Sequence, residues 1–157
     1  MWYRLPRAEY ERGKGARNRS ALKKLVGTDQ PAGVIAYAGD QPIGWCAVAP
    51  RAAFVRLETA RTLKPVDEKP VWSIVCLFVQ RAYRRQGVSV ALLNGAAEYA
   101  RSLGAKIVEG YPVEPRSGAI PAVFAHPGTP SAFRSAGFRE VAHPSPARAI
   151  MRRQLAK

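Results

Sequence analysis

The feature that most constrains the fold lies between residues 71 and 113, where a strand, a turn, a helix and a second strand follow one another. VWSIVCLFV is almost wholly apolar, which is typical of a central strand covered on both faces. An apolar stripe from Val88 to Leu103 predicts a helix that ends at Gly104, and AKIVEGYPV reads as the next strand. Because β-α-β crossovers join parallel strands, these two strands should run parallel.

The rest of the chain predicts antiparallel strands and short helices around this crossover. GVIAYAGDQPIGWCAVAP reads as a hairpin, since Gly39 and Asp40 tolerate positive φ and Pro42 fixes the turn. The fold class is therefore α+β, a central mixed but mostly antiparallel sheet with one parallel β-α-β crossover. The other predicted elements are a strand at 1–6, helices at 18–27 (capped by Asn18), 51–63 and 131–137, strands at 138–142 and 147–155, and a long loop at 114–130.

Length and composition indicate one soluble domain spanning residues 1–157. No apolar run approaches the roughly 20 residues that span a bilayer. The N-terminal stretch is too polar for a secretory signal, and Glu9 and Glu11 argue against an organellar transit peptide, so a cytoplasmic protein without a membrane partner is expected. Cys46 and Cys76 lie in apolar runs, which favours buried free thiols, and no C-x-x-C motif predicts a metal site.

The balance of charge favours an anionic partner. There are 25 Lys and Arg residues against 11 Asp and Glu residues, a net charge of +14, and such a field attracts nucleic acid, acidic protein or a phosphorylated cofactor. A basic soluble protein with no such partner is an equal alternative. Because the basic residues are dispersed and no basic-aromatic motif is present, a nucleic-acid-binding module is the less favoured reading.

The turn from Arg84 to Ser89 is the strongest candidate for an anion site. If a helix starts near Gly87, the amides of residues 86–89 lack intrahelical acceptors and lie at the positive end of the helix dipole. Gly87 leaves room for a phosphate, and Arg84 and Arg85 add charged donors suited to its oxygens. The alternative is a capped helix with solvated arginines.

The same turn resembles a signature of the GNAT superfamily of N-acetyltransferases. In VQRAYRRQGVS, Arg84, Gly87 and Ser89 occupy the marked places of the pattern Arg or Gln, two residues, Gly, one residue, then Gly or Ala, with a serine at the last place. GDQPIGWCAV resembles the family's second and third strands, and AFRSAGFREV resembles its closing helix and strand. The order of elements matches from Gly33 to the C-terminus, which implies the family's mixed sheet with helices on both faces.

By this resemblance the ligand is acetyl-CoA, the donor in direct acetyl transfer to a primary amine. Its pyrophosphate is expected on the amides of residues 85–89, and its pantetheine arm along the strand edge where the two parallel strands splay apart. No motif indicates whether the acceptor is a small-molecule or a peptide amine, and homodimers are common among relatives. The expected cofactor-binding residues are Leu77, Val79, Arg84, Arg85, Gln86, Gly87, Val88 and Ser89.

The catalytic groups are less clear, because the chain departs from the family pattern at two points. Phe133 stands where relatives often place an acidic tyrosine, and VWSIVCLFV carries no carboxylate to act as a base. Glu109 is the first candidate base because a mid-strand charge is unusual, and Tyr111, on the same strand face, could replace the missing acid. His126 lies in the loop near the expected acceptor mouth. Further candidates, each with a structural alternative, are Glu58 and Glu114 as bases and Cys76 as a nucleophile.

Two other functions stay open. Gly87-Val88-Ser89-Val90-Ala91 resembles the G-x-S-x-G nucleophile elbow, but QRAYRRQ separates it from its strand and no Asp follows Asp67. Alternatively, the absence of a tyrosine at Phe133 would leave a non-catalytic acetyl-CoA-binding protein with the same fold.

Overall fold

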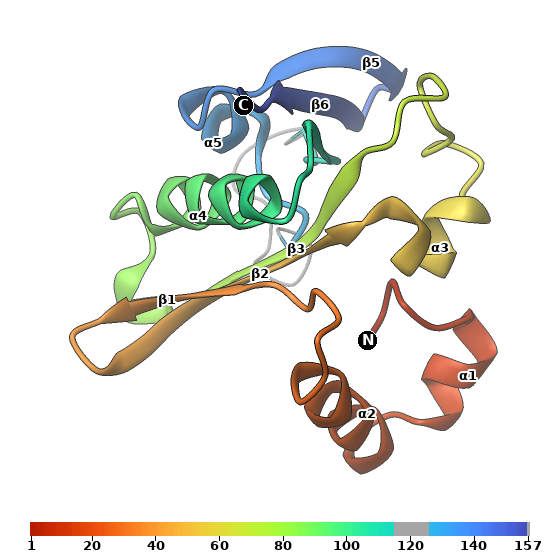
Figure 1. The fold of residues 1–157 in the computed structure, drawn as a ribbon, viewed down its shortest axis with the longest axis vertical. Coiled ribbons are helices and arrows are strands. Elements are labelled where there is room, and N and C mark those ends of the chain that lie inside the picture. Colours follow the sequence, from red (N-terminus) through yellow and green to blue (C-terminus); the bar gives the residue numbers. More distant parts are fainter. Residues whose placement is uncertain (115–125, 157) are drawn as a thin grey trace.

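A six-stranded mixed sheet forms the centre of the protein, whose computed structural model describes residues 1–114 and 126–156 (Figure 1). The strands lie in the order β1-β2-β3-β4-β6-β5. Among the described residues only β3 and β4 pair in parallel, and this confirms the α+β class with one crossover. The strands are β1 (Val34–Ala38), β2 (Gln41–Pro50), β3 (Trp72–Val79), β4 (Ile107–Gly110), β5 (Arg139–Ser145) and β6 (Arg148–Gln154).

The crossover helix α4 (Val88–Ser102) covers one face of the sheet, together with α5 (Pro130–Ser135). Leu92 and Leu93 of α4 pack into one buried cluster with Cys46 of β2 and Ile74 of β3. Burying a side chain of this size contributes roughly 1.5–3 kcal/mol. The 3.6-residue spacing of the apolar stripe therefore fixes which side of the helix faces the strands.

The opposite face of the sheet is covered by a second buried cluster. Phe54, Leu57 and Leu63 pack there with Tyr111 and Ile150. Figure 1 shows the N-terminal helices on this side and α4 on the other, which confirms helices on both faces. The elements on this side are α1 (Arg7–Arg12), α2 (Ala16–Val26), the 3₁₀ turn η1 (Arg51–Ala53) and α3 (Val55–Glu58).

The N-terminal residues differ from their prediction. Residues 1–5 form turns instead of a strand, because the amides of Arg4 and Leu5 both donate to the Met1 carbonyl, at 2.9 and 3.2 Å. Asn18 is not a cap, since α2 begins after Gly15; its side chain donates instead to the Tyr10 carbonyl at 2.9 Å. That bond ties α2 to α1, a helix that the sequence pattern did not predict.

The predicted helix over residues 51–63 is also wrong. The backbone breaks at Phe54, with φ −115° and ψ 80°, between η1 and α3. Arg51 is buried, and its guanidinium donates to the carbonyls of Leu57 and Leu63 at 3.2 and 2.6 Å. The chain wraps around this side chain, which satisfies carbonyls that a continuous helix would have paired internally.

Two further predictions concern the limits of the fold. The long loop predicted at 114–130 lies mostly outside the described residues. Within the described residues, no helix has the length and the apolar character that crossing a membrane requires.

Candidate functional site

The turn that leads into α4 contains backbone amides that have no acceptor among the described residues. Arg85 and Gly87 both adopt left-handed backbone conformations, with φ of 61° and 80°. The Gly87 carbonyl accepts from Val90 and Ala91 at 2.9 and 3.1 Å, while the amides of residues 87–89 find no acceptor among the described residues. A Cβ on Gly87 would meet nothing within 4 Å, so the backbone is open at the residue where the unpaired amides of the helix begin.

Side chains of the turn hold it against the end of β3. Arg84 donates from Nε to the Val79 carbonyl at 3.1 Å, and Gln86 donates from Nε2 to the Ala82 carbonyl at 2.8 Å. Arg84 is therefore partly a structural residue, although its remaining guanidinium donors stay exposed. Arg85 makes no such bond within the described part of the chain, so its charge is the more freely available of the two.

A cavity of about 420 Å³, the cofactor cavity, opens at this turn. Its described lining contains two guanidinium groups, those of Arg84 and Arg85, and no carboxylate. The lining also contains four residues with aliphatic hydroxyl groups: Ser89, Thr129, Ser131 and Ser135. The positive helix end and two guanidinium groups suit an anion such as a diphosphate. Six of the eight residues predicted to bind the cofactor line it: Val79, Arg84, Arg85, Gly87, Val88 and Ser89.

Leu77, one of the two remaining residues, lies where the parallel strands separate. The register of β3 with β4 ends at Ile74 and Gly110. Beyond that point the Leu77 amide donates to the His126 carbonyl at 2.6 Å. A ligand can pair with this amide only if the His126 carbonyl moves away. Pantetheine pairing at Leu77 therefore stays a prediction, and it carries this geometric condition.

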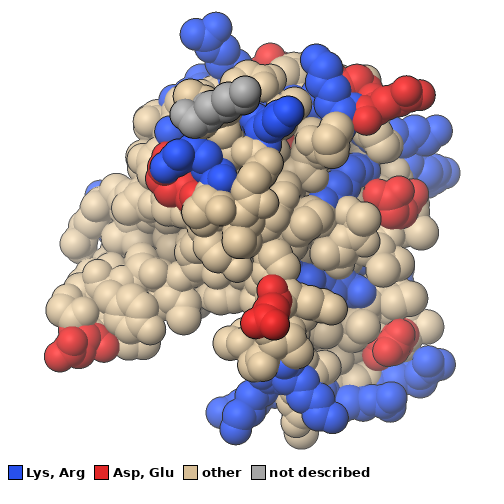
Figure 2. Space-filling model, in the orientation of Figure 1, with Lys and Arg blue, Asp and Glu red and all other residues tan. Residues whose placement is uncertain are grey.

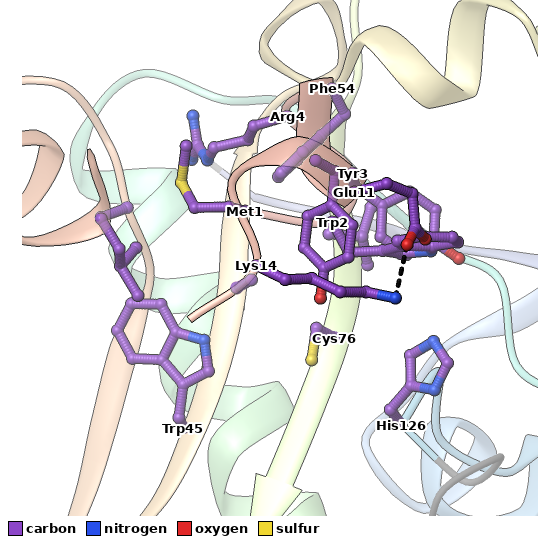
Figure 3. Close-up of a pocket in the computed structure, with 15 residues that line it drawn as sticks. Met1, Trp2, Tyr3, Arg4, Glu11, Lys14, Trp45, Phe54, Cys76 and His126 are labelled. Atoms are coloured by element: carbon purple, nitrogen blue, oxygen red, sulfur yellow. Dashed lines mark ion pairs between the residues drawn. The ribbon is translucent and has the colours of Figure 1, made fainter. Parts of the chain in front are cut away.

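A second cavity, of about 550 Å³, lies on the side of the N-terminal helices; we call it the aromatic cavity (Figure 3). Val75 and Cys76 of β3 line it, and His126 lies at its edge. Its aromatic walls come from distant parts of the chain: Trp2, Tyr3, Tyr10, Trp45 and Phe54. The sequence pattern missed these residues; for Trp2, Tyr3 and Tyr10 the only signal was the density of aromatic and charged side chains in the first fourteen residues.

The two basic side chains of the aromatic cavity, Lys14 and Arg4, differ in whether a carboxylate neutralises them. Lys14 forms an ion pair with Glu11, which Figure 3 marks with a dashed line. The Arg4 guanidinium stacks 4.8 Å from the Phe54 ring centroid and donates to the Pro31 carbonyl at 2.6 Å. No carboxylate of the described residues pairs with Arg4, so the cavity retains one uncompensated positive charge from these side chains.

The sulfur of Cys76 is disfavoured as a nucleophile. Burial raises the pKa of the Cys76 thiol, so the group keeps its proton at neutral pH. Since the thiolate is the reactive form, the position of Cys76 on the cavity floor suits packing better than covalent catalysis. Cys46 is fully buried, and burial raises its thiol pKa too.

Glu109 and Tyr111 belong to a buried polar network and line neither cavity. Glu109 has no exposed surface; it accepts from Arg152 Nε at 2.6 Å and from the Tyr111 hydroxyl at 2.7 Å. Arg51 donates to the same hydroxyl at 2.8 Å. Burial, and then the nearby Glu109 charge, raise the pKa of Tyr111 well above its usual range. This geometry favours a structural role for both residues, and the expectation that the pair supplies the base and the acid stays a prediction.

The weaker candidate bases also lie away from the aromatic cavity. Glu58 is exposed and lies 3.4 Å from Arg51 Nε, and Glu114 lies 4.0 Å from Arg134. Of the carboxylates and histidines considered as catalytic groups from the sequence, only His126 is in the described lining of the aromatic cavity. Among the described residues, no cluster of three or more His, Cys, Asp and Glu side chains could hold a metal ion.

Comparison with known proteins gives one matching family and several solved structures of similar fold. A sequence model of the acetyltransferase (GNAT) family matches residues 1–121. No match to a curated protein was found. A Bacillus subtilis acetyltransferase solved in complex with CoA is 16% identical, with TM-score 0.52 and coverage of 97% of this chain and 95% of that one. The ribosomal-protein-alanine N-acetyltransferase of Brucella melitensis is 17% identical, with TM-score 0.55 and coverage of 88% and 76%. An aminoglycoside 6'-N-acetyltransferase from Acinetobacter haemolyticus is 21% identical, with TM-score 0.50 and coverage of 82% and 76%.

Proposed function

Because the chain belongs to the GNAT family of acetyltransferases, we propose that it transfers the acetyl group of acetyl-CoA directly to a primary amine. The observation that carries the proposal is that one strand, β3, lines both cavities. Val79 lines the cofactor cavity, and Val75 and Cys76 line the aromatic cavity. A donor held at the α4 turn and an acceptor held among the aromatic side chains would therefore meet along this strand.

The residues of the turn fit the diphosphate of the donor. The open amides of residues 87–89 would donate to phosphate oxygens, and Arg85 would add a charged donor from the rim. The left-handed φ of Gly87 and the open space at its Cβ position let phosphate approach the backbone. The Bacillus subtilis protein, which shares this fold, was solved in complex with CoA, and this supports a CoA ligand for the present chain.

Acetyl transfer from a thioester to an amine requires few catalytic groups from the protein. Acetyl-CoA supplies an acetyl group activated as a thioester. Transfer forms a C–N bond and breaks the C–S bond; the ammonium form of the acceptor loses two protons, one of which ends on the departing sulfur and the other in solvent. We assign His126 the role of accepting the first proton, because it is the predicted catalytic residue that lines the aromatic cavity. A covalent route through Cys76 is disfavoured by the raised pKa of its thiol.

The test compares two charge reversals in thermal stabilisation by acetyl-CoA. Arg85→Glu reverses a charge that lines the cofactor cavity, and Arg81→Glu makes the same change on an exposed residue outside it. At a concentration of 100 times Kd, acetyl-CoA should stabilise the wild type and Arg81→Glu by about 2.7 kcal/mol. Arg85→Glu should show clearly less. Equal stabilisation of both variants would remove the diphosphate from this turn.

Thiol release measured with a panel of amines then separates catalysis from binding. Release of CoA with at least one amine is the expected result. Stabilisation by acetyl-CoA without release would favour the non-catalytic alternative. Nucleic-acid binding with a steep salt dependence, in the absence of acetyl-CoA binding, would favour the alternative of a nucleic-acid-binding module. Figure 2 argues against that reading on the visible face, where Lys and Arg side chains lie in separate groups among acidic and uncharged ones.

A further inference from the structure

We propose that the acceptor is a small amine with an apolar, ring-sized body and a carboxylate, the chemistry of a hydrophobic amino acid, and that Arg4 pairs with this carboxylate. The inference rests on the proposed function and names the class of its acceptor. Three observations carry it: the aromatic walls, the occupied carboxylate and the uncompensated guanidinium of the aromatic cavity.

The aromatic walls are held in place before any ligand binds. The Trp2 ring packs edge-on against Tyr10, with centroids 4.9 Å apart, and Arg56 stacks 3.7 Å from the Trp2 ring centroid. Trp45 of β2 and Phe54 lie on other sides of the same space. Fixed rings of this kind give a ring-shaped ligand a large contact area with little loss of conformational entropy.

Glu11 is the only carboxylate in the described lining of the cavity, and it already has a partner. Glu11 pairs with Lys14, so it offers little to a second cation. A polyamine or an aminoglycoside carries several ammonium groups, which need carboxylates or carbonyls around them. In this cavity such a ligand would meet the uncompensated Arg4 guanidinium instead, and the like charges would repel it.

Arg4 is the complementary feature for an anion. Its Nη2 donates to the Pro31 carbonyl, and a guanidinium has five donor hydrogens in all, so several remain. No carboxylate of the described residues neutralises it, and desolvation by burial lowers its pKa without removing its charge. A ligand carboxylate would form a charge-assisted, fork-shaped pair with this group.

The first experiment compares acceptors that differ by one group. L-phenylalanine and phenethylamine share the ring and the amine, and only the former has the carboxylate. Thiol release should show a kcat/KM for L-phenylalanine roughly tenfold or more above that for phenethylamine or L-phenylalaninamide. Spermidine and kanamycin should be poorer still. Equal values for the first two acceptors, or a preference for the polycations, would overturn the inference.

The second experiment locates the effect at Arg4. In Arg4→Gln the ratio of kcat/KM for L-phenylalanine over phenethylamine should fall toward one. Arg7→Gln, an exposed arginine at the start of α1 that does not line the cavity, should keep the wild-type ratio. A ratio that is the same in all three proteins would refute the role of Arg4, whatever its absolute value.

A binding measurement keeps this inference separable from the proposed function. Trp2 and Trp45 line the aromatic cavity, so intrinsic fluorescence reports its occupation directly. L-phenylalanine and N-acetyl-L-phenylalanine should change that fluorescence in the wild type and bind at least tenfold more weakly to Arg4→Gln, roughly the effect of one charge-assisted pair. No change in the wild type would overturn the acceptor class. Binding without any stabilisation by acetyl-CoA would instead leave the acceptor class standing and count against the proposed function.

Discussion

The substitution Glu109→Gln separates a structural role for this carboxylate from a catalytic one. Glu109 accepts from both Arg152 and Tyr111, and Arg51 Nη1 lies 3.6 Å from its Oε1. The amide of glutamine has one acceptor oxygen for these donors, and its NH₂ group would face another donor. The substitution also removes the buried negative charge that both arginines share.

The expected loss of stability is about 3 kcal/mol, at the lower end of the roughly 3–5 kcal/mol measured when one partner of a buried ion pair is removed. The lower end applies because each arginine retains another ion pair: Arg152 with Asp67 at 2.7 Å, and Arg51 with Glu58 at 3.4 Å. For a chain of this length the melting temperature should fall by roughly 6–12 °C. The expected loss of about 3 kcal/mol is a large part of the roughly 5–15 kcal/mol by which a folded domain is more stable than its unfolded chain.

The assay is urea unfolding at neutral pH, with kcat measured on the folded fraction. Glu98→Gln is the matched control, because Glu98 pairs with Arg101 on the surface of α4 and should change stability by less than about 1 kcal/mol. A structural Glu109 predicts lost stability with kcat largely kept at saturating acceptor. A Glu109→Gln protein as stable as the control but with kcat lowered a hundredfold or more, roughly the contribution of a general base, would contradict this reasoning.

Two further substitutions test the core and the cavity floor. Leu93→Ala, at a residue with no exposed surface in the cluster under α4, should cost roughly 2–5 kcal/mol in urea unfolding, whereas Leu103→Ala, 52% exposed, should cost well under about 1 kcal/mol. Similar losses for both would mean that α4 does not pack as described. Cys76→Ala should keep most of kcat, because burial raises the pKa of the thiol and so reduces the reactive thiolate. For the same reason iodoacetamide should modify Cys76 slowly at neutral pH and faster only as the pH rises past the ordinary thiol value of about 8.5; rapid modification at pH 7 with loss of activity would restore the nucleophile hypothesis.

The elements that the sequence predicted well are those whose signals are local and periodic. The apolar run of β3 and the 3.6-residue stripe of α4 determine burial on their own, and both elements lie where they were expected. The helix predicted over residues 51–63 failed because Arg51, a charged residue in the pattern, is buried and binds the carbonyls of Leu57 and Leu63. A burial of that kind depends on Glu109 and Tyr111, more than fifty residues away, so no local pattern could have shown it.

The two cavities of the candidate site also differ in whether local sequence determines them. The bonds that shape the α4 turn lie within residues 79–91, so Gly87 and its neighbouring arginines were sufficient to locate the cofactor cavity. The aromatic cavity joins Trp2, Trp45, Cys76 and His126, which lie far apart in the sequence. Its character follows from tertiary packing and not from any short motif. Solved structures under 25% identical to this chain show its fold alone, so the acceptor has to be inferred from this protein's own side chains. For that reason the unpaired charge of Arg4 is a better guide to the acceptor than the acceptors of its structural neighbours.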